Sequence, residues 1–166
     1  MQPVPSFQFL SIPWVLVGGL ATRAYMPERV TLDVDILIHE TDERTARQEF
    51  ENAGYQIEGD LSIGGFTAQR GNEAPVDILA SRAAWVPQAL GQPGQDAAGL
   101  PVLGRPYLMV MKLVAGRLQD LTDVQRMLRD TPQDERTSTR KLIQQCARDM
   151  AEDFDQLVLI ADAEFG

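Results

Sequence analysis

The spacing of apolar residues in the first forty positions predicts two strands with a short helix between them. The run Trp14–Val17 is apolar throughout and stops at two glycines, which is typical of a buried strand that ends in a tight turn. We expect a helix from Leu20 to Tyr25, because Pro27 follows and proline disfavours helical backbone in the residue before it. A second strand is predicted over Thr31–Ile38, where apolar residues alternate with mostly polar ones.

The rest of the chain predicts a helix, three short strands and then helices. Thr41 is a suitable N-cap for a helix that ends at Gly54, since glycine is favoured just beyond a helix C-terminus. In the last predicted helix apolar residues recur every three to four positions, among them Cys146, which we therefore place in the core. The further strands are predicted at 55–58, 65–69 and 75–79, and the further helices at 83–90, 106–115 and 120–128.

The expected fold is α/β (α+β), with a small mixed sheet, packed helices and a helical C-terminal part. We expect a single domain over 1–166, with its core at about 14–129 and one C-terminal helix at about 131–163. The chain has 166 residues, of which 44% are apolar and 23% charged, close to globular averages. The apolar runs are too short to span a membrane and no signal peptide is visible, so we expect a cytoplasmic protein.

Charge and cysteine content exclude several functional classes. The formal net charge of −9 argues against a large basic groove for duplex nucleic acid. A single cysteine excludes a disulfide framework and a zinc ribbon, and a single histidine, His39, excludes a site built on several imidazoles.

The informative motif is a pair of aspartates in the second predicted strand. Asp33 and Asp35 are two residues apart, so they project from the same face of that strand. Aspartate is depleted in strand interiors, and like charges close together repel. One explanation is a bound Mg²⁺, a hard cation that takes carboxylate oxygens, waters and substrate phosphates. The other is a sheet face open to water that solvates both carboxylates, and the pair alone leaves both interpretations open.

A third aspartate strengthens the metal interpretation. Asp77 is embedded among apolar strand residues in the same way as Asp33 and Asp35. If the two strands are neighbours, three carboxylates converge on one sheet face. Such a set can hold two metal ions that clamp the attacking and leaving oxygens of a phosphoryl transfer. Asp77 is then also a candidate acceptor for the proton of an attacking hydroxyl.

Gly18 and Gly19 mark the turn between the first predicted strand and helix. Glycines permit close backbone approach, and a helix N-terminus offers free N–H groups to a phosphate. Such turns also occur for packing reasons alone. The chain contains neither a Walker A motif nor a G-x-G-x-x-G fingerprint, so this turn has to be interpreted together with the aspartates.

Taken together, these residues resemble the nucleotidyltransferase superfamily of the DNA polymerase β type. Its pattern is a Gly-Gly or Gly-Ser turn, a short connection, Asp-x-Asp on a strand, and a third acid on a later strand. Here 13 residues separate Gly19 from Asp33. The run from Arg29 to Asp35 is also similar to the Arg-x-Thr-x-Asp-x-Asp of minimal and AbiEii-like bacterial members.

The resemblance extends into the second half of the chain, to about residue 129. The AbiEii-like members also carry a distal helix with a lysine, a Gly-Arg break and Asp-x-x-Asp, which Lys112, Asp120 and Asp123 match. The likeness departs at Tyr25-Met26, where many relatives have His-Gly. The last predicted helix matches no feature of the family.

The resemblance implies a Mg²⁺-dependent nucleotidyltransferase, with two ions, that moves a nucleoside monophosphate from an NTP such as ATP to a hydroxyl acceptor. It assigns the metal ions and the catalysis to Asp33, Asp35 and Asp77. It assigns the nucleotide to Gly18, Gly19, Arg29, Thr31 and Lys112. The acceptor stays open between tRNA, a protein and a small molecule, although the acidic composition disfavours tRNA.

Each of the accompanying residues also has a purely structural interpretation. Lys112 can extend from a half-buried helix to solvent. Asp120 can be an N-cap with Asp123 as its N3 partner, so capping explains both. Arg29 and Thr31 can brace the loop before the strand instead of contacting the triphosphate.

Two other functional classes compete with the transferase. The first is a non-catalytic nucleotide-binding or toxin–antitoxin interaction module with the same fold. The second is a metal-dependent phosphohydrolase, which commonly uses additional histidine ligands that this chain lacks apart from His39. The segment 157–160 is apolar on more than one face of its helix, which suggests a homodimer or an antitoxin partner bound through the C-terminal helix.

Overall fold

The structure is a computed structural model that describes residues 4–166. Its internal contacts divide the chain into two units. The first unit contains the residues up to 21 and those from 30 to 103, and the second contains residues 22–29 and 104–166. The single domain over 1–166 stays a prediction, and we describe each of the two compact units by itself.

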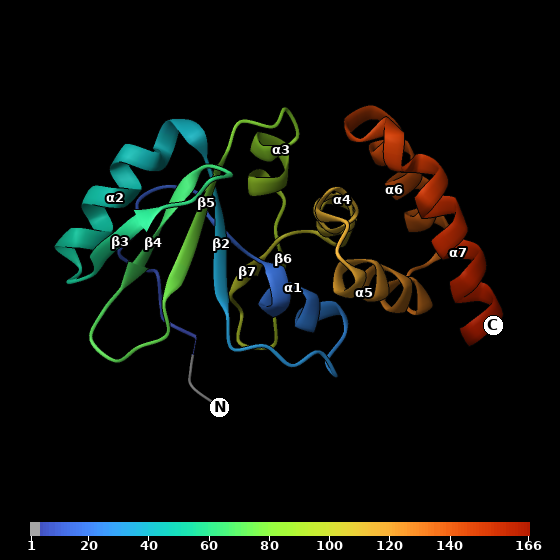
Figure 1. The fold of residues 1–166 in the computed structure, drawn as a ribbon, viewed down its shortest axis with the longest axis horizontal. Coiled ribbons are helices and arrows are strands. Elements are labelled where there is room, and N and C mark those ends of the chain that lie inside the picture. The colour runs from blue at the N-terminus through green and yellow to red at the C-terminus, as the bar shows by residue number, and fades with distance from the viewer. Residues whose placement is uncertain (1–3) are drawn as a thin grey trace. The chain divides into compact units, whose positions relative to one another are not determined.

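The first unit is built on a mixed seven-stranded sheet with the order β3-β4-β5-β2-β1-β7-β6 (Figure 1). Strand β2 is parallel to β5 and β1 is parallel to β7, whereas the other neighbours are antiparallel. The strands are β1 (Val15–Val17), β2 (Val34–His39), β3 (Gln56–Asp60), β4 (Gly65–Gln69), β5 (Val76–Ser81), β6 (Gly94–Gln95) and β7 (Pro101–Val102). The predicted mixed α/β fold is confirmed.

Strand β2 begins three residues later than the sequence pattern predicts. The backbone N–H of Asp33 donates a hydrogen bond to the Thr31 hydroxyl oxygen at 3.2 Å. Such local side-chain bonds compete with a regular strand ladder. Residues 31–33 are therefore irregular and lead into the strand at Val34.

Helices cover the sheet of the first unit and close its core. The elements are α1 (Gly18–Tyr25), whose first turn belongs to this unit, η1 (Glu40–Asp42), α2 (Glu43–Asn52) and α3 (Val86–Gly91). Helix α2 lies along β3 and β4 (Figure 1) and buries Phe50. The Phe50 ring contacts those of Phe7 and Phe66, with both centroid distances at 5.8 Å.

The central strands place two aspartates on the sheet face opposite fully buried apolar residues. On β5, Val76 and Ile78 are fully buried while Asp77 between them is half-buried. On β2, Ile36 is fully buried and the preceding Asp35 is half-buried. Because successive strand residues point to opposite faces, both aspartates lie on the face away from Ile36 and Ile78.

The second unit is helical. Its elements are α4 (Arg105–Ala115), α5 (Leu118–Arg129), α6 (Gln133–Cys146), η2 (Arg148–Met150) and α7 (Ala151–Phe165), together with the end of α1. Helix α4 packs against α5 and α6, and α5 packs against α7. Gly116 ends α4 with φ of +67°, a left-handed conformation that glycine adopts without strain.

The single C-terminal helix predicted over about 131–163 is two helices. Helix α6 ends at Cys146, and the chain reverses through η2 into α7. Arg140 contacts Asp155 at 2.8 Å and Arg136 contacts Asp162 at 2.7 Å, so α7 runs back along α6. The reversal leaves Cys146 at the end of a helix, where it is exposed, and our prediction of a core cysteine is wrong.

Candidate functional site

Gly18 and Gly19 directly follow β1 as the first two residues of α1, and they lie against β2 and the segment before it. Gly18 has a φ of +62°, and a Cβ atom built on it would lie 2.4 Å from the Asp35 carboxylate oxygen Oδ2. A Cβ on Gly19 would lie 2.6 Å from Cβ of Thr31. The space that the two missing side chains would need is therefore filled by Asp35 and Thr31, and the glycines bring the backbone against these two residues.

Asp35 and Asp77 are neighbours across two parallel strands. They are register partners in the β2–β5 pair, and both are half-buried on the same face of the sheet. On the other side of β2, Asp35 is the register partner of Val17, the residue before the glycine turn. The structure therefore brings together the turn, Asp35 and Asp77, which the sequence places far apart.

We call the register-paired Asp35 and Asp77 the aspartate row. Thr67 lies next to this row, on the neighbouring strand β4, and the sequence did not predict its role. Thr67 is the register partner of Asp77, and its hydroxyl donates a 2.6 Å hydrogen bond to the Asp77 oxygen Oδ1. Its neighbours in β4, Phe66 and Ala68, are fully buried on the opposite face, so Thr67 lies on the same face of the sheet as Asp77. This alternation is visible in the sequence, but the strand pairing that places Thr67 beside Asp77 is not.

Asp33 lies just before β2 and differs from the other two aspartates. It is exposed, whereas Asp35 and Asp77 are half-buried in strands. Among residues 4–166, no three His, Cys, Asp or Glu side chains are grouped so that they alone could hold a metal ion. The predicted three-carboxylate cluster is therefore not preformed, and the strands bring together only the pair Asp35 and Asp77.

This pair of carboxylates has the donor chemistry for Mg²⁺ in the presence of a nucleotide. Mg²⁺ is usually bound by one or two carboxylates together with substrate phosphates and water, and less often by an all-protein cage. Asp35 and Asp77 supply two such carboxylates on neighbouring strands. Asp33 is close in sequence and accessible, so it remains a predicted third ligand.

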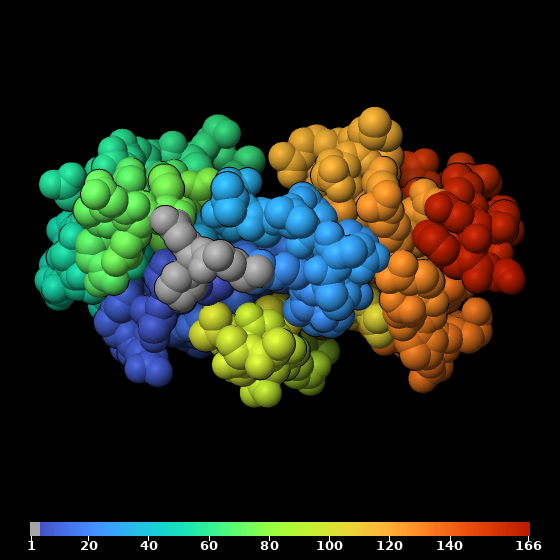
Figure 2. All heavy atoms as spheres, turned by 90° about the horizontal axis from the view of Figure 1, so that it is seen from below, coloured from blue at the N-terminus to red at the C-terminus, as the bar shows by residue number. Residues whose placement is uncertain are grey.

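The segment before β2 is open to solvent. Val30 and Leu32 are 79% and 82% exposed, while Thr31 between them packs beside Gly19. Figure 2 shows the chain around these positions, in light blue, on the surface of the molecule. The side of the candidate site formed by residues 30–33 is thus accessible to an incoming molecule.

Lys112 and two aspartates form a buried charge cluster in the second unit. Lys112 lies in α4, and its Nζ is 2.8 Å from Asp123 Oδ2 and 3.5 Å from Asp120 Oδ1. The Asp123 side chain is fully buried and also accepts hydrogen bonds from Gln119 at 2.9 Å and from Arg29 at 3.3 Å. Lys112 therefore pairs α4 with α5, and its predicted contact with phosphates stays a prediction, as does that of Arg29.

The predicted capping roles of the two aspartates need correction. Helix α5 begins at Leu118, with Arg117 as its N-cap and Asp120 at N3, where its carboxylate accepts the Arg117 backbone N–H at 3.3 Å. Asp120 therefore caps the helix from N3 and not as the N-cap. Asp123 is one turn further on and caps nothing, because its oxygens are taken by Lys112, Gln119 and Arg29.

The surroundings of Asp120 favour its charged form. Burial raises the pKa of this carboxyl, but hydrogen bonds from Arg117 and the positive charges of Lys112 and Arg117 outweigh burial. The pKa of Asp120 therefore lies below its ordinary value of 3.8. The carboxylate at the helix start is held ionised down to acid pH.

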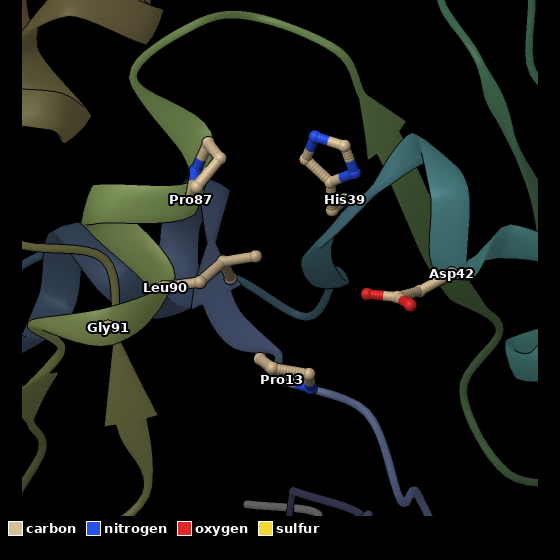
Figure 3. A pocket seen from close by; sticks show the side chains of 6 residues that line it. All are labelled: Pro13, His39, Asp42, Pro87, Leu90 and Gly91. Carbon is tan, nitrogen blue, oxygen red and sulfur yellow. The ribbon is translucent and has the colours of Figure 1, made fainter.

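A separate hollow of about 360 Å³ lies at the other end of β2 (Figure 3). His39 and Asp42 point into it between apolar walls that include Pro13, Pro87 and Leu90. His39 Nδ1 accepts a hydrogen bond from the Thr41 backbone N–H at 3.2 Å, so His39 is the N-cap of η1. Asp35 is four residues earlier in β2, roughly 13 Å along the strand, so the hollow is not part of the aspartate row.

The C-terminal helix leaves apolar side chains uncovered. Leu159 and Ile160 on α7 are 62% and 48% exposed. The predicted homodimer or antitoxin contact through this helix stays a prediction. Within residues 4–166, each helix is too short or too polar to cross a membrane.

Comparison with known proteins yields a likeness of fold only. No family model matches the sequence, and neither does any curated protein. A solution structure of the antibiotic-resistance factor ANT(2'')-Ia matches with 17% identity over 93% of this chain and 84% of that chain, with a TM-score of 0.49. A crystal structure of ANT(2'')-Ia in complex with adenylyl-2''-tobramycin matches with 18% identity over 93% of this chain and 90% of that chain, with a TM-score of 0.50. The second match shows a likeness of fold, and the mixed α/β fold of this chain is nucleotidyltransferase-like.

Proposed function

We propose that this chain is a nucleotidyltransferase that moves a nucleoside monophosphate from an NTP to a hydroxyl acceptor and releases pyrophosphate. The observation that carries the proposal is the register pairing of Asp35 with Asp77, with the Gly18 turn packed against Asp35. The nucleotidyltransferase-like fold supports it. A sheet face that served packing alone would not need two aspartates side by side in its central strands.

Each residue of the candidate site has a separate role in the proposed reaction. Asp35 and Asp77, joined by Asp33, would hold Mg²⁺ against the triphosphate, with two ions expected. When bound, Mg²⁺ neutralises the negative charge that develops on the phosphates. The first turn of α1, which begins at Gly18, offers backbone N–H groups to a phosphate. The acceptor oxygen bonds to the α-phosphorus as the bond to pyrophosphate breaks, and Asp77 takes the hydroxyl proton.

We further propose that the acceptor is a cationic small molecule. The first unit, which carries the row, has four arginines, no lysine and twelve Asp or Glu residues, so it holds nearly all of the net charge of −9. Such a surface attracts cations and repels the phosphates of RNA. The adenylyl-2''-tobramycin bound to ANT(2'')-Ia, an adenylylated amino sugar, supports this class of acceptor.

The experiment is a transfer assay with four NTPs labelled at the α-phosphate, in the presence of Mg²⁺. Tobramycin, total cell RNA and a soluble protein extract serve as separate acceptors. We expect labelled tobramycin with the wild-type chain and none with Asp35→Asn. Asp42→Asn is the matched control, because Asp42 lines the hollow at the other end of β2 and should retain transfer.

The other outcomes distinguish the remaining functions. Labelled RNA or labelled protein would support the proposed transferase activity but overturn the proposal that the acceptor is a cationic small molecule. Labelled nucleoside mono- or diphosphate without a labelled acceptor would indicate a phosphohydrolase. Nucleotide binding without transfer to any of the acceptors would favour the non-catalytic interaction module. A toxin–antitoxin role would then be the function to test.

A further inference from the structure

We propose that Thr67 is a positioning residue of the candidate site. Its hydroxyl fixes the Asp77 carboxylate in one orientation, so that Oδ2 is the oxygen presented to the acceptor or to Mg²⁺. The inference rests on the proposed function, because Asp77 is the residue that takes the acceptor proton there. It adds a residue on a third strand, β4, to the row formed by Asp35 and Asp77.

The geometry of the hydrogen bond defines the role of each oxygen. Thr67 Oγ1 donates to Asp77 Oδ1 at 2.6 Å, the short distance expected when a hydroxyl donates to a carboxylate. A hydroxyl has a single proton, so this bond uses the whole donor capacity of Thr67. Oδ1 is engaged with the protein, and Oδ2 keeps its lone pairs for an incoming group.

Thr67 is well suited to hold a neighbour in place. It is β-branched, so few side-chain rotamers are open to it. Its strand β4 is hydrogen-bonded on both edges, to β3 and to β5, which fixes its backbone. The Asp77 side chain has a broad terminal torsion and would otherwise sample several orientations.

Asp77 needs such a restraint because of its other neighbour. Asp35 is its register partner on β2, so two carboxylates face the same side of adjacent parallel strands. Without a bound cation the two side chains tend to turn away from each other, because their like charges repel. A hydrogen bond to a charged group contributes more free energy than the repulsion between two like charges on neighbouring strands. The bond from Thr67 therefore keeps the Asp77 carboxylate beside Asp35.

The consequence for the reaction is specific. The acceptor O–H bond breaks and its proton goes to Asp77 Oδ2, while the acceptor oxygen bonds to the α-phosphorus and pyrophosphate leaves. Thr67 keeps its own proton throughout and touches neither substrate. Loss of its hydroxyl should therefore slow the transfer step more strongly than it weakens NTP binding, which Asp35 also supports.

The first test examines orientation and does not depend on activity. Crystal structures of the wild-type chain, Thr67→Ser and Thr67→Val are compared without nucleotide. We expect one shared Asp77 rotamer in the wild type and in Thr67→Ser, which keeps the hydroxyl. In Thr67→Val, which is similar in shape but has no donor, Asp77 should turn or adopt several conformations. The same single rotamer in Thr67→Val would overturn the proposal.

The second test measures transfer. Thr67→Val should lower kcat by about tenfold to a hundredfold, as expected for losing a hydrogen bond to a charged group, with a smaller change in KM for the NTP. Thr67→Ser should recover most of kcat. Thr122→Val is the matched control, because the Thr122 hydroxyl bonds only the Leu118 carbonyl on the exposed side of α5.

The two tests separate this proposal from the proposed function. If the wild-type chain transfers nothing while Asp77 still changes rotamer in Thr67→Val, the transferase is overturned and the positioning of Asp77 stands. If the wild type is active and Thr67→Val keeps full kcat, the positioning role is overturned and the transferase stands. Melting curves of all variants confirm that a lost rate reflects a folded protein.

Discussion

Lys112 on α4 and Asp123 on α5 form a buried ion pair, with Nζ and Oδ2 2.8 Å apart. The side chains are 7% and 0% exposed, so water solvates neither charge. The remaining Asp123 oxygen accepts a hydrogen bond from Gln119. The pair therefore belongs to a closed network in which each charge depends on its partner.

Removal of the acid from this network should destabilise the second unit strongly. Asp123→Ala leaves the Lys112 ammonium buried with only Asp120 as counter-charge, and breaking a buried pair in this way typically costs about 3–5 kcal/mol. Denaturant unfolding of the variant and the wild type measures the difference. A helix cap would cost less, about 0.5–2 kcal/mol.

A double variant checks the reason for this loss. Lys112→Met with Asp123→Leu removes both charges and fills the space with apolar atoms, which should recover most of the stability. If the double variant is less stable than Asp123→Ala alone, the unpaired charge is not the cause.

Asp120 should give the protein a distinct response to acid. Its pKa is lowered in the folded chain, so the ionised form stabilises the fold above the unfolded value of 3.8. That contribution is lost as the pH falls through the folded pKa, which lies below 3.8. Urea unfolding from neutral pH to about pH 2 should show a steeper acid loss in the wild type than in Asp120→Asn. Parallel curves for the two proteins would contradict the assignment.

Gly18 should tolerate alanine less well than another glycine with similar backbone geometry. Gly18 and Gly71 have φ values of +62° and +53°, so alanine at either position should cost about 1–2 kcal/mol of backbone strain. At Gly71 the space around a Cβ is open, whereas at Gly18 the Cβ meets Asp35 Oδ2. Thermal melts should therefore show a larger loss for Gly18→Ala, and an equal loss would mean that Asp35 moves aside without cost.

Mg²⁺ with nucleotide should stabilise the folded chain through the aspartate row. A ligand present at about 100 times its dissociation constant adds about 2.7 kcal/mol to the free energy of unfolding. We expect a rise in melting temperature for the wild type with Mg²⁺ and NTP, little rise with NTP in EDTA, and none for Asp35→Asn. A rise of equal size in Asp35→Asn would place the binding site elsewhere.

The sequence predicts those residues of the candidate site that stand out in the local pattern of apolar and polar positions. Asp35 and Asp77 stand out because each interrupts an apolar strand pattern, and the structure places both on one face. Thr67 carries no such signal, since threonine is common in strands and its role arises from the pairing of β4 with β5. Long-range pairing is set by packing of the whole sheet, which a window of a few residues does not contain.

The predicted ends of two helices are wrong for a related reason. Capping explains Asp123 when α5 is taken to begin at Asp120, but the helix begins at Leu118 and turns Asp123 inward to Lys112. The break after Cys146 lacks a proline or glycine, so nothing local announces it. It depends on arginine–aspartate pairs between residues at least fifteen positions apart, which form only after the chain has reversed.

The route of the chain through its two units determines how the protein can be divided. Residues 22–29 belong with the helical unit, where Arg29 reaches Asp123 and Glu28 pairs with Arg129 at 3.0 Å. A single cut after residue 103 would deprive the helices of this segment and leave it attached to the sheet. The fragment from residue 104 onward is therefore an incomplete helical unit, and this unit expressed alone would need residues 22–29 joined to it by a circular permutation or a linker.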